Sequence, residues 1–277
     1  MEDNIQEMYQ RARTAFDEVR FWPQDKVDEM VEAVAWELLK EDVRHKLGHL
    51  AVDESGIGNA EDKVNKIKNK TLGTLWDMRN AKTCDLIEEN KALGIRKYAK
   101  PIGVIANVVP CTNPESTICC LALSTLKTRN AQIVSPHPRT QKTSYETVQH
   151  VRKALEKIGA PADLVQCIEK TNHAKTAELM AHCDFAVATG GAALVKVVYA
   201  AGKPAQTVGA GNVVSIVDDT VDLAAAAHKI RLSKVANNSA SCSSENAVAL
   251  YESIYDDERS EERRVGKGCR SRWSWHH

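Results

Sequence analysis

The segment best suited to covalent chemistry is a short polar loop around one cysteine. Cys242 lies within residues 239–246 (SASCSSEN), directly before an apolar run over 247–250. Most cysteines are small buried core residues, and that remains the alternative for any one of them. Backbone N–H groups and hydroxyls around a thiol, however, stabilise the thiolate, which is the nucleophilic form. Cys242 is therefore the candidate nucleophile.

Two glycine-containing segments could bring the backbone close to a phosphate. Thr189, Gly190 and Gly191 follow a short apolar run and open a helical pattern, where free N–H groups attract anions. Gly209 and Gly211 lie in a second segment, 202–212 (GKPAQTVGAGN), which has three glycines and an Asn between two strand-like runs. Taken alone, the first segment is equally typical of a tight turn, and the second is expected to be a loop.

No metal site is predicted. The eight cysteines contain no C-x-x-C pair, and we expect them to be reduced thiols. His45 and His49 have the i, i+4 spacing of a zinc pair on a helix. Lys46 stands where a zinc protease needs a glutamate, so exposed structural histidines are the favoured interpretation.

The elements that position these residues alternate from residue 100 onward. Short apolar runs predict strands, and amphipathic segments between them predict helices. The strands are expected over 104–109, 131–134, 164–168, 185–188 and 213–217, and the helices over 115–127, 141–157, 174–182, 190–200 and 221–235. This alternation is typical of an α/β fold with a parallel sheet covered on both faces, which binds ligands at the carboxyl ends of its strands.

The first hundred residues have a helical pattern. Amphipathic helices are expected over 4–20 and 24–47, with Pro23 at the start of the second, where proline is tolerated. A turn over 55–59 precedes a charged helix over 60–70.

Composition excludes several classes of protein. The 277 residues contain 37 Lys+Arg and 37 Asp+Glu, so neither a basic nucleic-acid coat nor an acidic tail protein is expected. No apolar run reaches the ~18 residues of a membrane span, and no secretory signal is visible. We therefore expect a cytoplasmic protein without membrane or nucleic-acid partners.

The last twenty residues differ from the rest. Residues 258–277 are rich in arginine, contain two tryptophans and offer no apolar face. Residues 259–267 resemble a translated sequencing adapter, so a non-native disordered tail is favoured over a basic arm. The chain is then interpreted as a fragment that lacks its natural C-terminal part.

Together the segments resemble the aldehyde dehydrogenase superfamily, and specifically its CoA-acylating branch. The matching motifs, in order, are 51–58 (AVDESGIG) with 61–63 (EDK), 101–106 (PIGVIA), 109–114 (VPCTNP), 135–139 (SPHPR), 189–191 (TGG) and 209–212 (GAGN). The resemblance implies a Rossmann-type parallel sheet with flanking helices and a truncated catalytic domain. It implies four regions: an N-terminal helical segment packing on the nucleotide domain (1–100), an NAD(P)-binding domain (101–236), the start of the catalytic domain (237–257) and the tail (258–277).

The same resemblance assigns roles to residues. Cys242 matches the nucleophile that forms a thioester with the substrate, and Asn113 or Thr112 matches the oxyanion donor beside it. The residues that match cofactor contacts are Pro110, Ser135, His137, Pro138, Arg139, Thr189, Gly190, Gly191, Gly209 and Gly211. Hydrolytic relatives carry a Lys and a Glu where Ser135 and Pro138 stand here, so NAD and NADP both remain open.

Thr207 marks the difference from the hydrolytic branch. Hydrolytic members carry a general-base Glu at this position, and threonine cannot act as a base at neutral pH. The resemblance therefore implies CoA as the acyl acceptor and a small aldehyde as substrate, either acetaldehyde or sulfoacetaldehyde. The polar loop after Asn237 and Asn238 mildly favours sulfoacetaldehyde. The alternatives are an acyl-phosphate reductase of the same superfamily and an inactive nucleotide-binding fragment. A homo-oligomer is expected.

Overall fold

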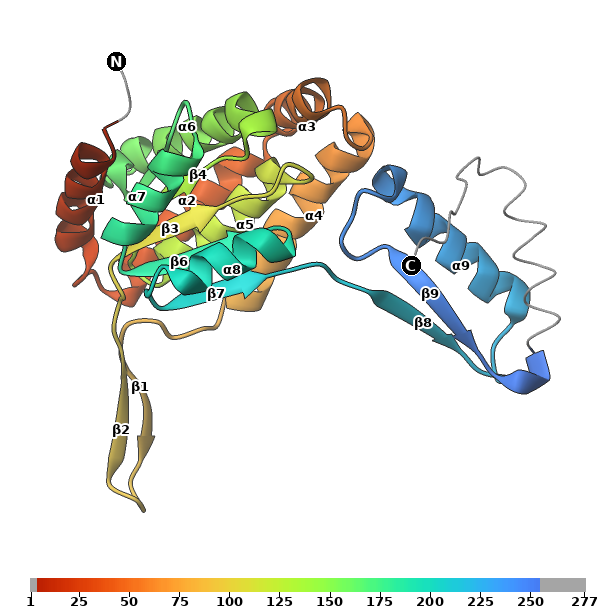
Figure 1. Cartoon of the computed structure of the whole chain (residues 1–277). Helices are drawn as coiled ribbons and strands as arrows, with labels where there is room; N and C mark the ends of the chain where they lie inside the picture. The colour runs from red at the N-terminus through yellow and green to blue at the C-terminus, as the bar shows by residue number, and fades with distance from the viewer. Residues whose placement is uncertain (1–3, 255–277) are drawn as a thin grey trace. The chain divides into compact units, whose positions relative to one another are not determined.

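The computed structural model describes residues 4–254 and shows them as two compact units (Figure 1). One unit extends to Ala210, and the other begins at Gly211. The tail predicted over 258–277 lies outside the described residues. Among the helices of residues 4–254, none has the length and apolar content that a membrane span requires.

The first unit is built around a five-stranded sheet in which every strand is parallel to its neighbours. The strands are β3 (Val104–Val108), β4 (Ala131–Ser135), β5 (Val165–Cys167), β6 (Phe185–Thr189) and β7 (Ala205–Val208), in the spatial order β5-β4-β3-β6-β7. The chain runs outward from β3 to β5, then returns to the other side of β3. The connections after β3 and β6 therefore diverge, which makes this pair the switch point where such sheets bind ligands.

Helices cover both faces of this sheet. One layer holds α5 (Pro114–Lys127) and α6 (Gln141–Lys157), with α2 (Gln24–Leu39) packed outside them. The other face carries α1 (Ile5–Val19) and α7 (His173–His182), which contact each other and β3. The predicted α/β architecture is confirmed.

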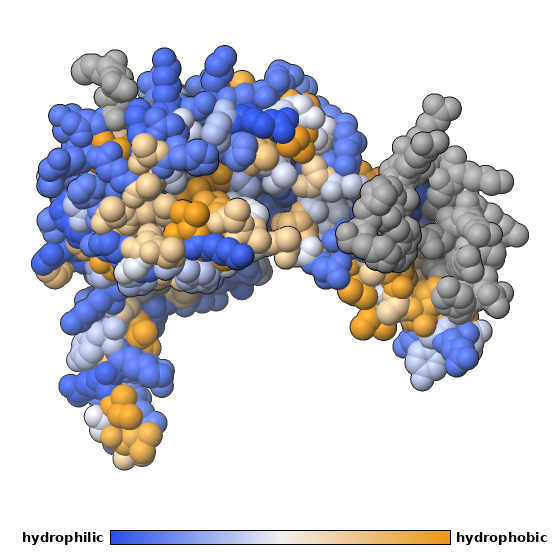
Figure 2. All heavy atoms as spheres, viewed as in Figure 1, coloured by the Kyte–Doolittle hydropathy of each residue, from blue (hydrophilic) through white to orange (hydrophobic). Residues whose placement is uncertain are grey.

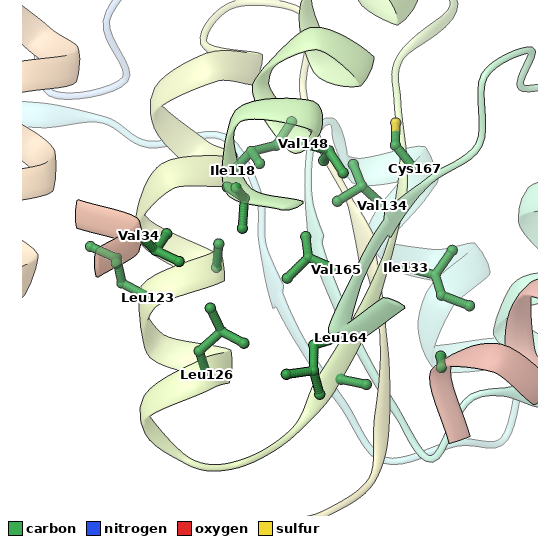
Figure 3. Close-up of a cluster of buried hydrophobic side chains, with 14 of the residues drawn as sticks. Val34, Ile118, Leu123, Leu126, Ile133, Val134, Val148, Leu164, Val165 and Cys167 are labelled. Atoms are coloured by element: carbon green, nitrogen blue, oxygen red, sulfur yellow. The ribbon is translucent and has the colours of Figure 1, made fainter. Parts of the chain in front are cut away.

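The core lies between these layers and the sheet (Figure 3). Leu123 and Leu126 of α5 and Val34 of α2 pack toward Val134 and Val165, and all five are fully buried or nearly so. Each such side chain contributes about 1.5–3 kcal/mol when it is removed from water. The strands read from the sequence as continuous apolar runs because both of their faces are covered.

The remaining helices of the first unit are α3 (Glu41–Ser55), α4 (Ala60–Met78) and α8 (Ala192–Ala200), with short 3₁₀ turns η1 (Pro138–Thr140) and η2 (Ala162–Leu164). The second unit contains β8 (Val213–Val217), α9 (Leu223–Val235), η3 (Ala236–Ser239), β9 (Glu245–Leu250) and η4 (Glu252–Ile254). In this unit β8 and β9 pair in parallel.

Two local predictions were wrong, and one element was not predicted. The helix expected over 24–47 is two helices, because Lys40 adopts an extended conformation (φ −57°, ψ 139°) while the apolar periodicity continues on both sides. Residues 85–99 form an antiparallel hairpin of β1 (Asp85–Asn90) and β2 (Ile95–Ala99), which lacks a buried face and hence the expected alternation. β7 lies in a segment that was expected to be a loop.

A buried carboxylate connects α2 to α6. Glu37 is 2% exposed, and its side chain accepts hydrogen bonds from Lys40 and Lys157. The His150 Nδ1 lies 3.4 Å from the Glu37 Oε1. Burial alone would raise the pKa of Glu37, but these hydrogen bonds lower it from 4.5 to about 2. The ionised form therefore stabilises the folded protein.

We expect Glu37→Gln to destabilise the protein in a pH-dependent way. The pKa is lowered in the folded state, so the contribution is complete above pH 4.5 and is lost as pH falls toward 2. The expected loss at pH 7 is about 2 kcal/mol after allowance for the exposed lysines, shrinking toward zero in acid. Urea unfolding at pH 7, 4 and 3 measures it, with exposed Glu29→Gln as control. A loss that is equal at all three pH values would contradict the prediction.

Candidate active site

Two of the predicted cofactor segments meet at the switch point of the sheet. β3 and β6 pair in parallel, with Val108 opposite Ala188. Pro110 follows the first strand and Thr189 ends the second, so both lie at the carboxyl edge of the sheet. The first turn of α8 follows Gly191, which places free helix N–H groups at this edge.

The two glycines of this turn have different roles. A Cβ on Gly190 would lie 2.8 Å from Leu194 Cδ2, so a larger residue there would require the Leu194 side chain to move. A Cβ on Gly191 would meet nothing within 4 Å, so its backbone faces open space. This combination of close helix packing and an open backbone fits the way a pyrophosphate sits at a helix N-terminus.

The end of β4 supplies the next group of predicted residues. Ser135 is fully buried, and its hydroxyl lies 2.8 Å from that of Thr176 on α7 and 3.2 Å from that of Thr171. In the structure Ser135 therefore joins β4 to the α7 region. A role toward a cofactor stays a prediction.

Pro138 and Arg139 are exposed just beyond, and His137 is half-buried. The His137 Nδ1 accepts a hydrogen bond from the Arg139 backbone N–H at 3.1 Å. Burial, together with the nearby Arg139 charge, lowers the pKa of His137. Arg139 donates one hydrogen bond to the Ser55 carbonyl, and its guanidinium has further N–H groups that an anion could use.

The loop that carries the predicted oxyanion donors is held from behind by two lysines of α4. Lys63 is fully buried, and its Nζ donates to the Thr112 carbonyl at 2.7 Å. Lys66 Nζ donates to Asn113 Oδ1 at 2.7 Å, and Asn113 Nδ2 donates to Thr112 Oγ1 at 3.2 Å. These contacts fix the orientation of the Asn113 amide. Asn113 is buried and Thr112 half-buried, so the Thr112 hydroxyl is the more accessible of the two groups.

A buried acid completes this support. Glu115 is fully buried, and its Oε1 lies 3.7 Å from Lys63 Nζ. Burial raises the pKa of Glu115. From the sequence Lys63 was recognised only as part of a motif, and neither Lys66 nor Glu115 was predicted to have a role. Their roles depend on contacts between α4 and the start of α5, which local patterns do not reveal.

The second unit carries the predicted nucleophile. Cys242 is exposed and free, in the loop that leads into β9. Since β8 and β9 are parallel, the segments that enter them lie at the same end of the pair. A Cβ on Gly211 would lie 3.3 Å from the Cys242 carbonyl, and Asn246 Nδ2 donates to the Gly211 carbonyl at 3.4 Å. Gly211 therefore permits the close approach of the two loops.

The backbone just before the cysteine loop is strained. Asn237, Asn238 and Ser239 have positive φ values of 51°, 54° and 61°. Single Asn residues adopt this conformation readily, but three consecutive left-handed non-glycine residues are costly. Strain of this kind clusters at functional sites.

Gly209 belongs to the first unit, where it is exposed at the end of β7. Thr207 lies on β7 opposite Ala188 of β6 and is half-buried.

Exposure distinguishes Cys242 from the buried cysteines. Cys119 and Cys183 are fully buried, and burial raises the pKa of both thiols. We expect brief iodoacetamide treatment of the native protein to alkylate Cys242 first and to spare these two, because the thiolate is the reactive form. Peptide mass spectrometry after timed quenching measures this, and unfolded protein serves as the control. Labelling of Cys119 or Cys183 as fast as Cys242 would refute it.

Comparison with known proteins agrees with this geometry. The model of the aldehyde dehydrogenase family matches residues 1–264. Sulfoacetaldehyde dehydrogenase (acylating) of Bilophila wadsworthia is 40% identical over 262 residues, which are 95% of this chain and 56% of that protein. The chain spans about half the length of the curated relatives it matches.

Solved structures give the same result. An acetylating aldehyde dehydrogenase from Geobacillus thermoglucosidasius is 33% identical, with a TM-score of 0.88 over 94% of this chain and 57% of that one. An engineered glycolyl-CoA reductase with bound NADP+ is 28% identical, with a TM-score of 0.83 over 95% of this chain and 60% of that one. The chain therefore belongs to the aldehyde dehydrogenase family.

Proposed function

We propose that this chain supplies the cofactor-binding sheet and the nucleophile of an NAD(P)-dependent, CoA-acylating aldehyde dehydrogenase. The overall reaction is aldehyde + CoA + NAD(P)+ to acyl-CoA + NAD(P)H + H+. The observation that carries the proposal is that one chain contains both a switch-point sheet, edged by Pro110 and Gly191, and an exposed cysteine on a glycine-supported loop.

The residues of the chain have separate tasks in this proposal. Cys242 forms a bond from its sulfur to the aldehyde carbon, keeps the oxidised acyl group as a thioester and releases it to the CoA thiol. Thr112 or Asn113 donates a hydrogen bond to the carbonyl oxygen as negative charge develops there. The carboxyl edge of the sheet, with Arg139 nearby, holds the dinucleotide. The nicotinamide, when bound, supplies the hydride acceptor.

CoA is proposed as the acyl acceptor because of Thr207. A half-buried threonine hydroxyl on β7 cannot remove a proton from water at neutral pH. The CoA thiol has an ordinary pKa near that of cysteine and attacks a thioester without such a base. The acylating name of the Bilophila wadsworthia relative supports the same acceptor.

The aldehyde is proposed to be small, with sulfoacetaldehyde favoured over acetaldehyde. The support is the polar loop around Cys242 and the name of the same relative. Both NAD and NADP are retained as cofactors, since Arg139 is exposed where a 2′-phosphate could meet it.

We further propose a homo-oligomer in solution. Large apolar side chains stay exposed on the second unit, and Figure 2 shows hydrophobic residues gathered there. They include Ile216 (84% exposed) and Tyr251 (62%). Contiguous exposed apolar surface of this kind marks interaction sites.

The acyl acceptor can be tested in a hybrid enzyme, in which residues 4–254 replace the matching part of the Bilophila wadsworthia relative. We expect NAD(P)H formation from sulfoacetaldehyde to be at least about 100-fold faster with CoA than without it, because water is not activated. Thr207→Glu should raise the CoA-independent rate, and Thr207→Ser serves as the matched control. Equal rates with and without CoA would contradict the proposal, and stimulation by phosphate instead would indicate the acyl-phosphate reductase.

A further inference from the structure

A group of potential metal ligands lies on the outer surface of the α3–α4 corner, apart from the candidate active site. Its members are His45 and His49 of α3 and Glu61 of α4. One ligand atom from each lies within 4.8 Å of the other two. The sequence favoured exposed structural histidines here because Lys46 stands where a zinc protease needs a glutamate. In the structure the carboxylate comes from Glu61 of the next helix instead.

The packing of the two helices holds this group in place. Gly48 lies between the two histidines in sequence and is buried. A Cβ there would meet Val64 Cγ2 at 2.7 Å and the Ala60 carbonyl at 3.2 Å, so the first turn of α4 rests directly on α3. That contact places Glu61, the next residue after Ala60, beside His49, with 3.7 Å between Oε1 and Nε2.

Both helices are fixed at this corner. Asn59 caps α4 by accepting a hydrogen bond from the Asp62 backbone N–H at 3.1 Å. Near the end of α3, Glu54 accepts hydrogen bonds from the backbone N–H groups of Lys142 and Thr143, each at 2.8 Å. These contacts hold the backbone that carries the three side chains, while His49 and Glu61, which are 54% and 66% exposed, have room to rotate.

The geometry points to a binding site for a divalent transition-metal ion, of which Zn²⁺ is the representative, held by His45, His49 and Glu61. The rings of the two histidines lie side by side, with centroids 6.3 Å apart and 22° between their planes. Ligand atoms of a tetrahedral zinc ion with bonds of about 2.0–2.1 Å are ~3.3 Å apart. Small rotations of exposed side chains close the remaining gap.

The donor set selects the type of ion. Two imidazole nitrogens and one carboxylate oxygen suit Zn²⁺, Cu²⁺ and Ni²⁺, whereas Mg²⁺ and Ca²⁺ prefer oxygen ligands alone. Three protein ligands leave a fourth position for water. Without a metal, the same residues form at most an exposed His–Glu pair, which stabilises the fold little.

An ion at this site would link α3 to the helix that supports the Thr112–Asn113 loop. Glu61 binds on the outer side of α4, while Lys63 and Lys66 of the same helix hold that loop. Metal binding to the folded state alone raises its stability by mass action. We expect Zn²⁺ at 100 times its Kd to raise Tm by about 5 °C.

The test uses the whole chain with its accessible thiols alkylated, so that cysteines do not compete for the ion. Zn²⁺ is titrated against a chromophoric chelator, and Co²⁺ is added separately to look for d–d absorption bands of tetrahedral coordination. We expect one Zn²⁺ per chain with a Kd in the micromolar range. The double variant His45→Ala/His49→Ala should bind at least about tenfold more weakly and lose the Tm increase, with a smaller loss for Glu61→Gln.

His173→Ala, which removes another exposed histidine, is the matched control and should leave binding unchanged. Circular dichroism of each variant without metal confirms that its helices are intact. Equal Zn²⁺ affinity of the parent and the double variant, or no binding by the parent at millimolar Zn²⁺, would overturn the assignment. Neither result bears on the proposed dehydrogenase function, since these residues do not line the candidate active site.

Discussion

Replacing Cys242 with alanine in the hybrid enzyme should lower the rate of CoA-dependent aldehyde oxidation by about 10⁴-fold or more. The thioester cannot form without the sulfur, and Cys242 is the only exposed cysteine among the described residues. Cys119 and Cys183 are fully buried, with thiol pKa values raised by burial. The chain therefore offers no substitute nucleophile among them.

Two controls separate lost chemistry from lost folding. NADP+ binding, followed by intrinsic fluorescence, should be the same in Cys242→Ala and in the parent, since the dinucleotide is proposed to bind at the edge of the first-unit sheet. Cys120→Ala removes a half-buried cysteine of α5 and should keep most of the activity. Retention of more than about a tenth of the parent rate by Cys242→Ala would exclude Cys242 as the nucleophile.

The sheet could be predicted from the sequence because its strands are buried on both faces. β3 and β4 are buried throughout, and each stands out as an apolar run between helical segments. The hairpin of β1 and β2 could not be predicted from the sequence. Its residues are mostly exposed, so they show no alternation of apolar and polar residues that would mark a buried face. β7 is a four-residue edge strand, too short to separate from a loop by pattern.

The candidate site likewise contains residues that could be predicted from the sequence and residues that could not. Cys242 and the Gly190–Gly191 turn were recognisable because their chemistry lies in a few consecutive residues. The contacts that hold the Thr112–Asn113 loop were not recognisable from the sequence. Lys63 lies 49 residues from Thr112 and meets it only through the packing of α4 on α5. A lysine in a polar helix carries no local sign that it is fully buried.

That buried lysine gives the largest expected effect on stability. Lys63→Ala leaves the Glu115 carboxylate buried without its partner and removes the donor to the Thr112 carbonyl. Removing one member of a buried pair costs about 3–5 kcal/mol, which in a chain of this size lowers Tm by roughly 10 °C. Lys68→Ala, an exposed lysine of the same helix, should change Tm little.

The pH dependence of this loss shows whether charge or packing causes it. Burial raises the pKa of Glu115 above its ordinary value of 4.5, and the Lys63 charge opposes that rise. The stability contribution of Glu115 is therefore complete below pH 4.5 and is lost as pH rises through the folded pKa, and more steeply so once Lys63 is gone. Lys63→Ala should accordingly destabilise more at pH 8 than at pH 5, as measured by urea unfolding.

The double variant Lys63→Met/Glu115→Leu, which removes both charges, should recover most of the stability at pH 8. An equal loss at both pH values, with no recovery in the double variant, would mean that Lys63 acts through packing and its bond to Thr112 rather than by neutralising Glu115.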